Sequence, residues 1–312
     1  MNWFFSRLQL GATALCTIIS VFCATNSGAA PIEAVATTTM VADLIRVVGG
    51  DRVNVSGLMG PGVDPHLYKP TASDVTRLQK AQVVYYNGLL LEGRLADLLE
   101  RLGKRGKKVF AVADAIPQDR LLKPPQFEGS FDPHVWGDAE MWAGCADRVA
   151  ATLSEIDPAG KAEFESRASD YNRELAKLHV WAKEQVAKVE AGKRVLVTSH
   201  DAFNYFGRAY GFEVIGVQGI STVTEAGLAD IAKVSDLVLT RGIKAIFVES
   251  SVSRATIDRI SKDSGAKVGG ELFSDALGTS GKNHTIAGET YDEGTYVGML
   301  KHNVLTAVEA LK

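Results

Sequence analysis

One long helical pattern lies near the middle of the chain, at residues 157–192: DPAGKAEFESRASDYNRELAKLHVWAKEQVAKVEAG. It opens with Asp157-Pro158, a favourable start because proline at the first helical position sacrifices no hydrogen bond. Apolar side chains then recur three and four residues apart, at Phe164, Ala168, Tyr171, Leu175, Leu178, Ala182, Val186 and Val189. This spacing places them in one stripe of a single helix, and about thirty helical residues extend on the order of 45 Å. We interpret the segment as a rod between two lobes; the seam of a coiled-coil dimer is the competing interpretation.

Short apolar runs alternate with helical segments on both sides of the long pattern. Before it lie AVATTT, VNVSGLM, VVYYNG and KKVFAVAD, and after it lie RVLVTS, EVIGVQG, KAIFVES and AKVGGELF. Unbroken apolar strands spaced by helices are typical of parallel sheets covered on both faces. The predicted fold class is therefore α/β: two small parallel-sheet lobes joined by one long rigid helix, with a binding site in the cleft between them. The predicted bounds are 31–156 for the first lobe, 157–191 for the linking helix and 192–312 for the second lobe.

The first thirty residues differ from the rest. Residues 1–30 hold one Arg and no acid, then an apolar run of about fifteen, then small residues, which is the pattern of a cleavable secretory signal peptide. We expect cleavage near Ala30 and a periplasmic mature protein. A retained membrane anchor is the alternative, and the bulky residues before Cys23 disfavour lipid attachment there. Two of the three cysteines lie in this segment, so the remaining Cys145 is expected to be a buried, unreactive thiol.

Composition excludes several classes of protein. The 312 residues carry a formal net charge of -3 and are 46% hydrophobic, which is enough apolar chain for two ordinary cores and too much for disorder. Lys and Arg are scattered rather than gathered, so nucleic acid is not an expected partner.

The tripeptide Asp-Pro-His occurs twice, in GVDPHLY at residues 62–68 and in FDPHVWGD at residues 131–138. The chain has only six His, and two of them, His66 and His134, have this same setting. Proline fixes its own backbone angle and keeps the preceding residue extended, so the imidazole leaves the chain in a defined direction. The repeat indicates either two halves of one site or a coincidence of turn-forming residues.

Other ligand-type residues follow predicted strands directly. His200 follows RVLVTS, Glu249 lies at the end of KAIFVES, and Asp275 follows GGELF. These positions, with the two Asp-Pro-His corners, meet at the predicted cleft. Imidazoles and a carboxylate suit Zn²⁺ or Mn²⁺, and the lack of a thiolate argues against a soft copper site.

An acid lies beside each of the three selected histidines, at Asp64, Asp132 and Asp201. Metal-bound imidazoles need an acceptor at the other ring nitrogen, so these acids either supply it or simply make turns. The remaining histidines, His179, His284 and His302, are expected to be ordinary, with His284 exposed in a polar loop.

Several motifs together resemble the metal-specific solute-binding proteins of ABC importers. The motifs are GVDPHLYKPTASD, DPHVW, VTSHDAFNYF, FVESS, GGELFSDALG and GTYVGMLKHN. They are most similar to the TroA-type zinc and manganese binders, related to the zinc-uptake ZnuA and manganese-uptake PsaA groups, and they span essentially the whole mature chain. The resemblance implies two α/β lobes joined by one long helix, with an ion held between them by His66, His134, His200 and Asp275. Whether Glu249 contributes is left open.

The same resemblance implies a function. We expect a monomeric protein that is not an enzyme, and that carries Zn²⁺ or Mn²⁺ as cargo to an ABC permease in the inner membrane. Two departures matter: the segment RLLKPPQFEGS lacks the His-rich loop of many zinc-uptake relatives, and His200 stands where many manganese-specific relatives have Glu. The chain therefore resembles the type that binds both metals. The alternatives are a secreted zinc-dependent hydrolase, with Glu249 as its general base, and a surface adhesin.

Overall fold

The computed structural model describes residue 1, residues 30–127 and residues 129–312. The predicted signal peptide, with Cys16 and Cys23, therefore lies outside the described residues apart from its two ends. Cys145 is fully buried, and burial raises the pKa of its thiol, as expected for an unreactive core cysteine.

The first lobe is built on a four-stranded parallel sheet in the order β2-β1-β3-β4. Its strands are β1 (Ile32–Ala36), β2 (Val53–Gly57), β3 (Val83–Tyr86) and β4 (Lys108–Ala111). Its helices are α1 (Thr39–Gly49), α2 (Ala72–Lys80) and α3 (Ala96–Lys104). Helix α2 begins with a capping box, in which Thr71 and Asp74 each accept a hydrogen bond from the other's backbone N–H. The parallel sheet predicted from the apolar runs is confirmed.

The second lobe contains two parallel strand pairs that lie side by side. Strand β5 (Val195–Thr198) pairs with β6 (Glu213–Gly216), β7 (Ala245–Glu249) pairs with β8 (Lys267–Leu272), and β5 contacts β7. The helices of this lobe are α6 (Asn204–Tyr210), α7 (Leu228–Arg241), α8 (Ala255–Ser264) and α9 (Tyr296–Leu311).

An antiparallel hairpin replaces the expected polar loop in the second lobe. Strands β9 (Asn283–Ile286) and β10 (Glu289–Asp292) are joined by two residues with positive φ, Ala287 and Gly288, which is the geometry of a tight hairpin turn. The expectation of a solvent-exposed His284 is wrong: the ring lies in β9, half-buried, with Nε2 2.5 Å from the buried carboxylate of Glu293.

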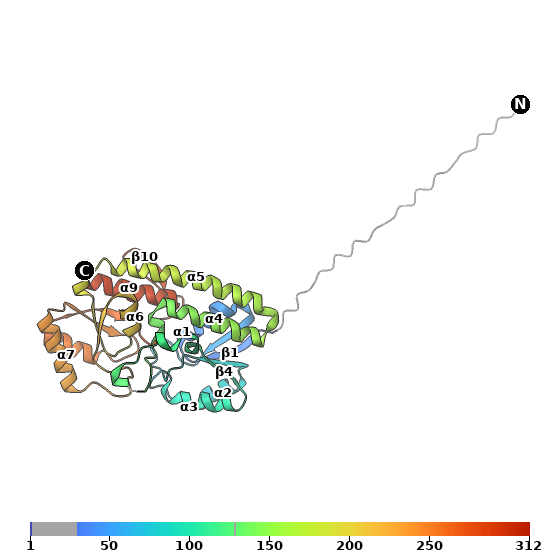
Figure 1. Cartoon of the computed structure of the whole chain (residues 1–312), viewed down its shortest axis with the longest axis horizontal. Helices are drawn as coiled ribbons and strands as arrows, with labels where there is room; N and C mark the ends of the chain where they lie inside the picture. The colour runs from blue at the N-terminus through green and yellow to red at the C-terminus, as the bar shows by residue number, and fades with distance from the viewer. Residues whose placement is uncertain (2–29, 128) are drawn as a thin grey trace. The chain divides into compact units, whose positions relative to one another are not determined.

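The long central helix, α5, spans Lys161–Val186, with one 3₁₀ turn before it at Pro158–Gly160. It is shorter than the predicted 157–191 and extends about 39 Å for its 26 residues. It packs against α4 (Ala139–Ile156), against α1 of the first lobe and against α9 of the second, as Figure 1 shows. The whole predicted apolar stripe is buried by these contacts.

The burial of this stripe excludes the coiled-coil seam, because the same chain already covers the apolar face that a second helix would need. The two lobes also share one hydrophobic core, which contains side chains from α1, α4, α5 and α9. The division at residues 156–157 and 191–192 stays a prediction.

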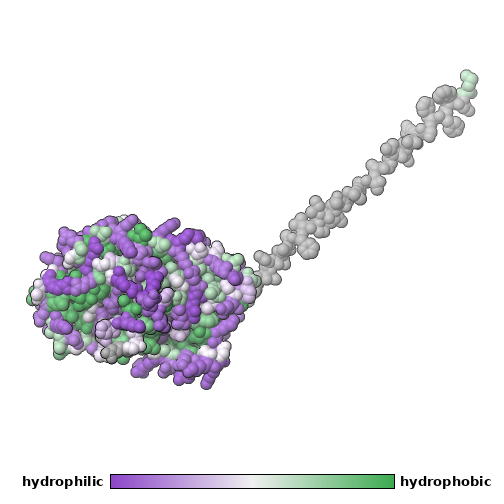
Figure 2. Space-filling model, in the orientation of Figure 1, coloured by the Kyte–Doolittle hydropathy of each residue, from purple (hydrophilic) through white to green (hydrophobic). Residues whose placement is uncertain are grey.

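Among the described residues, no helix is both long and apolar enough to cross a bilayer. Hydrophilic side chains cover much of the face seen in Figure 2, with hydrophobic ones scattered between them.

Asp43 links the two lobes through a buried carboxylate. It lies on α1, and its Oδ2 accepts a hydrogen bond of 2.9 Å from the backbone N–H of Tyr296 at the start of α9. Burial raises the pKa of Asp43 to about 6. Because the folded-state pKa lies above the unfolded value, Asp43 contributes stability that is present below about pH 4 and is lost as the pH rises through about 6.

We therefore expect Asp43→Asn to become more stable relative to wild type as the pH rises from 4 to 7. The difference in free energy of unfolding should change by about 3 kcal/mol over that interval, and any fixed cost of the amide cancels in the comparison. Thermal and denaturant unfolding of the two proteins with chelator present would measure it. A difference that does not vary with pH would contradict the assignment.

Candidate metal centre

The two Asp-Pro-His corners are built in the same way. His66 follows β2, and His134 stands at the start of the 3₁₀ turn Val135–Gly137. In each corner the aspartate two residues earlier accepts a hydrogen bond from the histidine's backbone N–H, at 2.8 Å from His66 to Asp64 and 3.0 Å from His134 to Asp132. The carboxylate therefore closes a local turn around the rigid proline, which sets the direction of the imidazole.

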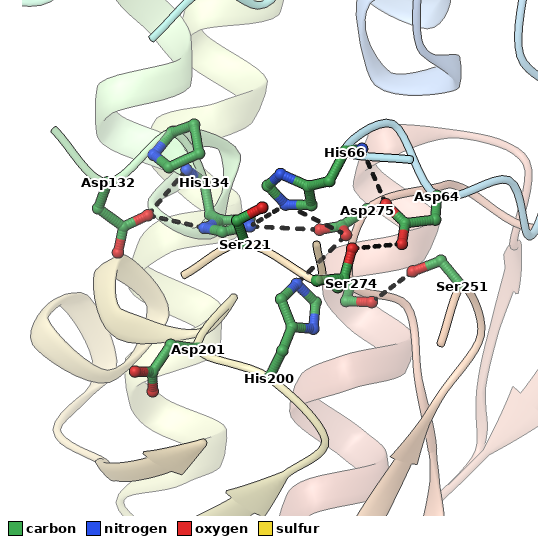
Figure 3. A network of polar contacts seen from close by, with 12 residues as sticks. Asp64, His66, Asp132, His134, His200, Asp201, Ser221, Ser251, Ser274 and Asp275 are labelled. Atoms are coloured by element: carbon green, nitrogen blue, oxygen red, sulfur yellow. Dashed lines mark hydrogen bonds and ion pairs between the residues drawn. The ribbon is translucent and has the colours of Figure 1, made fainter. Parts of the chain in front are cut away.

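The second lobe presents its ligand-type residues at the carboxyl ends of strands. His200 follows β5, Glu249 is the last residue of β7, and Asp275 follows β8. Because these strands run parallel, their carboxyl ends meet at the same edge and bring the three side chains together. His200 and Asp275 face the two corners of the first lobe (Figure 3).

Four side chains converge on one point, namely those of His66, His134, His200 and Asp275. One donor atom from each lies within 4.8 Å of the other three. The nearest approaches are 3.2 Å from His200 Nε2 to Asp275 Oδ2 and 3.3 Å from His66 Nε2 to His134 Nε2. The imidazoles of His134 and His66 lie 3.5 and 3.8 Å from Asp275. All four residues are at most 3% exposed.

Two buried carboxylates orient two of the rings. Asp132 Oδ1 lies 2.7 Å from Nδ1 of His134, and Glu249 Oε2 lies 2.6 Å from Nδ1 of His200. Glu249 Oε1 also accepts a hydrogen bond from the backbone N–H of His200 at 2.8 Å. An acceptor at Nδ1 favours a proton there and leaves the Nε2 lone pair to face the centre.

The three neighbouring acids therefore have three different roles. Asp132 holds the ring of His134, as sequence reasoning had allowed. Asp64 holds the backbone of His66 and makes a turn. Asp201 is the wrong partner for His200, because its Oδ1 accepts a hydrogen bond from Gly216 N while Glu249 reaches the ring. The sequence marks Glu249 by its place at the end of a predicted strand and by the motif FVESS, but neither signal identifies His200 as its partner.

Electrostatics favour a cation at the centre. Burial lowers the pKa of His66 to about 3, which keeps its imidazole neutral. Burial opposes the charged form of His200, but the carboxylates of Glu249 and Asp275 outweigh it and hold the pKa of His200 well above its usual value. Burial likewise disfavours ionised Asp275, yet the facing imidazoles, His200 first, hold the pKa of that carboxyl well below its usual range.

Buried polar atoms at the centre lack well-aligned hydrogen bonds. They include both carboxylate oxygens of Asp275 and Nε2 of His200. Leaving such atoms unpaired in a buried site is costly, and a coordinated cation would satisfy them together. The donor set and its orphaned atoms therefore fit a divalent metal ion.

The other histidines take part in different contacts. His302 accepts a hydrogen bond from the Tyr291 hydroxyl and donates one to the carbonyl of Glu271. His179 lies 3.5 Å from Asp138, which caps α4. Neither ring belongs to the four-residue centre, as expected.

Comparison with known proteins gives consistent matches. Residues 34–310 match the family described as ZnuA, zinc-uptake complex component A, periplasmic. The chain is 41% identical to the manganese-binding lipoprotein MntA of Bacillus subtilis over 313 residues, covering 97% of this chain and 98% of the relative. It is 41% identical to the zinc-binding protein TroA of Treponema pallidum over 283 residues, covering 89% and 88%. Among solved structures it is similar to the periplasmic zinc-binding protein TroA from Treponema pallidum, with a TM-score of 0.84 at 39% identity, covering 90% of this chain and 99% of that one.

Proposed function

We propose that this chain, which belongs to the ZnuA family of zinc-uptake components, captures Zn²⁺ or Mn²⁺ outside the cytoplasm and delivers it to the permease of an ABC importer. One observation carries the proposal: three imidazoles and one carboxylate from both lobes converge in a buried centre. A relative named for manganese and a relative named for zinc are each 41% identical to this chain, which supports proposing both ions as cargo.

The proposed ligands are His66, His134, His200 and Asp275, and their spacing suits a small cation. Zinc bonds of about 2.0–2.1 Å in a tetrahedral site give donor separations of about 3.3–3.4 Å. Among the proposed ligands, the distances from Asp275 to the three imidazoles and from His66 to His134 are 3.2 to 3.8 Å, and one donor atom from each of the four residues lies within 4.8 Å of the other three. The second oxygen of Asp275 offers one more donor for an ion that takes a larger coordination number. Nitrogen-rich sites bind Zn²⁺ more tightly than Mn²⁺, so we expect zinc to occupy the site when the two ions are present at equal concentration.

When the proposed site binds a metal ion, the positive charge of the ion replaces that of protons bound by the site's side chains. The imidazoles must be neutral to coordinate, and the pKa of His200 is raised by its carboxylate neighbours. Uptake at neutral pH should therefore release a proton from His200 and weaken in acid. Glu249 and Asp132 would keep the two rings oriented throughout.

The two alternative functions are not supported. Two relatives are named as metal-binding proteins, MntA of Bacillus subtilis and TroA of Treponema pallidum, and a third, SloC of Streptococcus mutans, as a metal ABC transporter substrate-binding lipoprotein. A hydrolase would also need Glu249 free to activate water, whereas its Oε1 accepts a hydrogen bond from the backbone N–H of His200 and its Oε2 lies 2.6 Å from Nδ1 of the same residue. The protein is a binding component and not an enzyme.

The finer details of location and assembly extend this proposal. Several relatives are named lipoproteins, which fits an extracytoplasmic protein. We propose a periplasmic location after removal of residues 1–30, docking on an inner-membrane permease, and a monomer. The burial of the α5 stripe within its own chain supports the monomer.

Removing one proposed ligand should abolish tight binding. We expect His200→Ala to lower zinc affinity by orders of magnitude, because three donors cannot complete the site. His284→Ala is the matched control, since its ring pairs with Glu293 rather than facing the centre. Competition titration of Zn²⁺ and Mn²⁺, with elemental analysis of protein purified from its native compartment, would measure both. Equal losses in the two variants would mean that the ligands are misassigned.

The carboxylate behind His200 should also matter. Glu249→Gln keeps the size of the side chain but removes its charge, so the imidazole of His200 loses the carboxylate that lies beside its Nδ1. We expect zinc affinity to fall about 10–100-fold, the usual loss when a hydrogen-bond partner of a metal ligand is changed. Glu289→Gln, at a half-buried glutamate paired with Lys301 in the β9–β10 hairpin, should bind like wild type. Unchanged affinity in Glu249→Gln would show that this contact is dispensable.

A further inference from the structure

Each Asp-Pro-His corner is bonded to the second lobe through the second oxygen of its aspartate. Asp64 Oδ1 closes the turn, and its Oδ2 accepts a hydrogen bond of 2.5 Å from the hydroxyl of Thr222. Asp132 Oδ1 does the same for its own turn, and its Oδ2 accepts a hydrogen bond of 3.1 Å from Asn204 Nδ2. The repeated aspartate therefore orients a proposed ligand and also joins the two lobes.

The two corners differ in how many bonds fasten them. The corner of His134 is also held by the Tyr205 hydroxyl, which donates to the Asp132 carbonyl at 2.9 Å. Two residues beyond His134, Trp136 Nε1 donates to the Ser274 carbonyl at 2.8 Å and its own carbonyl accepts from the Tyr296 hydroxyl at 2.7 Å. For the His66 corner, in the described part of the chain, the bond from Thr222 is the one hydrogen bond to the second lobe.

The loop that carries Thr222 is hydrogen-bonded to the backbone on both sides of His200. This loop begins beside His200, where Gln218 N donates to the Ser199 carbonyl and Asp201 N donates to the Gly219 carbonyl. Thr222 is only 5% exposed. Its hydroxyl therefore connects the backbone next to His200 with the corner that carries His66, two proposed ligands on opposite sides of the centre.

An ion held at this centre can leave only when the lobes separate locally, because the four proposed ligands are almost fully buried. The His66 corner is the side with the fewest bonds to break. We propose that Thr222 is a positioning residue whose hydroxyl latches the His66 corner to the second lobe and sets the rate at which the bound ion escapes. This inference rests on the proposed metal-binding function.

The test is the rate of zinc release from loaded protein into excess chelator, followed by stopped flow. Thr222→Val keeps the shape of the side chain and removes the donor, so release should become about tenfold faster or more, as expected for losing one hydrogen bond to a charged group. Thr222→Ser restores the hydroxyl and should return the rate toward wild type. Thr290→Val is the matched control, because Thr290 shares a hydroxyl–hydroxyl bond of 2.9 Å with Thr285 in the remote hairpin.

Thermal unfolding of the metal-free variants separates a latch from a general loss of structure. Faster release in Thr222→Val, with rescue by serine and an unfolding temperature like that of Thr290→Val, would support the latch. Release at the wild-type rate, or equal acceleration in Thr222→Ser, would overturn it. If wild-type protein takes up no zinc, the proposed function itself fails, and this outcome is distinct from an unchanged release rate.

Discussion

The structure depends on balancing charge where water is excluded. Asp275 is fully buried, and the carboxylates of Asp132 and Glu249 lie behind two of the three imidazoles that surround it. Burying an ionised carboxylate without partners is strongly unfavourable, so the donors of both lobes must meet closely. The parallel strands of the second lobe and the Asp-Pro corners of the first satisfy this requirement by delivering side chains to one point from opposite directions. A divalent cation completes the balance that protons otherwise supply.

The helical core fixes the position of the first lobe relative to the second. Helix α5 packs on α1 from the first lobe and on α9 from the second, and all three share one core with α4. Close-packed side chains do not deform continuously, so a large hinge rotation would require breaking this core. The bond between Asp43 and the start of α9 adds a polar tie across the same junction. Changes on metal binding are therefore expected to be small and concentrated in the loops around the centre, unlike the wide closure of flexible two-lobed binders.

Sequence reasoning reached the α/β class, the long helix and the four converging residues, because each left a local signal. The repeated Asp-Pro-His marked His66 and His134, and the positions of His200 and Asp275 after apolar strands marked the other two. What it missed depends on contacts between distant segments. Glu249 reaches His200 because β7 lies beside β5, an adjacency that no local pattern encodes. The partner of Asp64 lies 158 residues away. The β9–β10 hairpin was missed because its strands are four residues each and mostly polar.

The double use of the corner aspartates has a consequence for how such a protein can diversify. One carboxylate oxygen of each aspartate closes the turn that carries a proposed ligand, whereas the other accepts a hydrogen bond from a threonine or an asparagine of the second lobe. Under the proposed latch, substitution of Thr222 would change how long the ion is retained while the four proposed ligands stay the same. The residence time of the ion and the choice of metal would then be separately adjustable traits within a single fold.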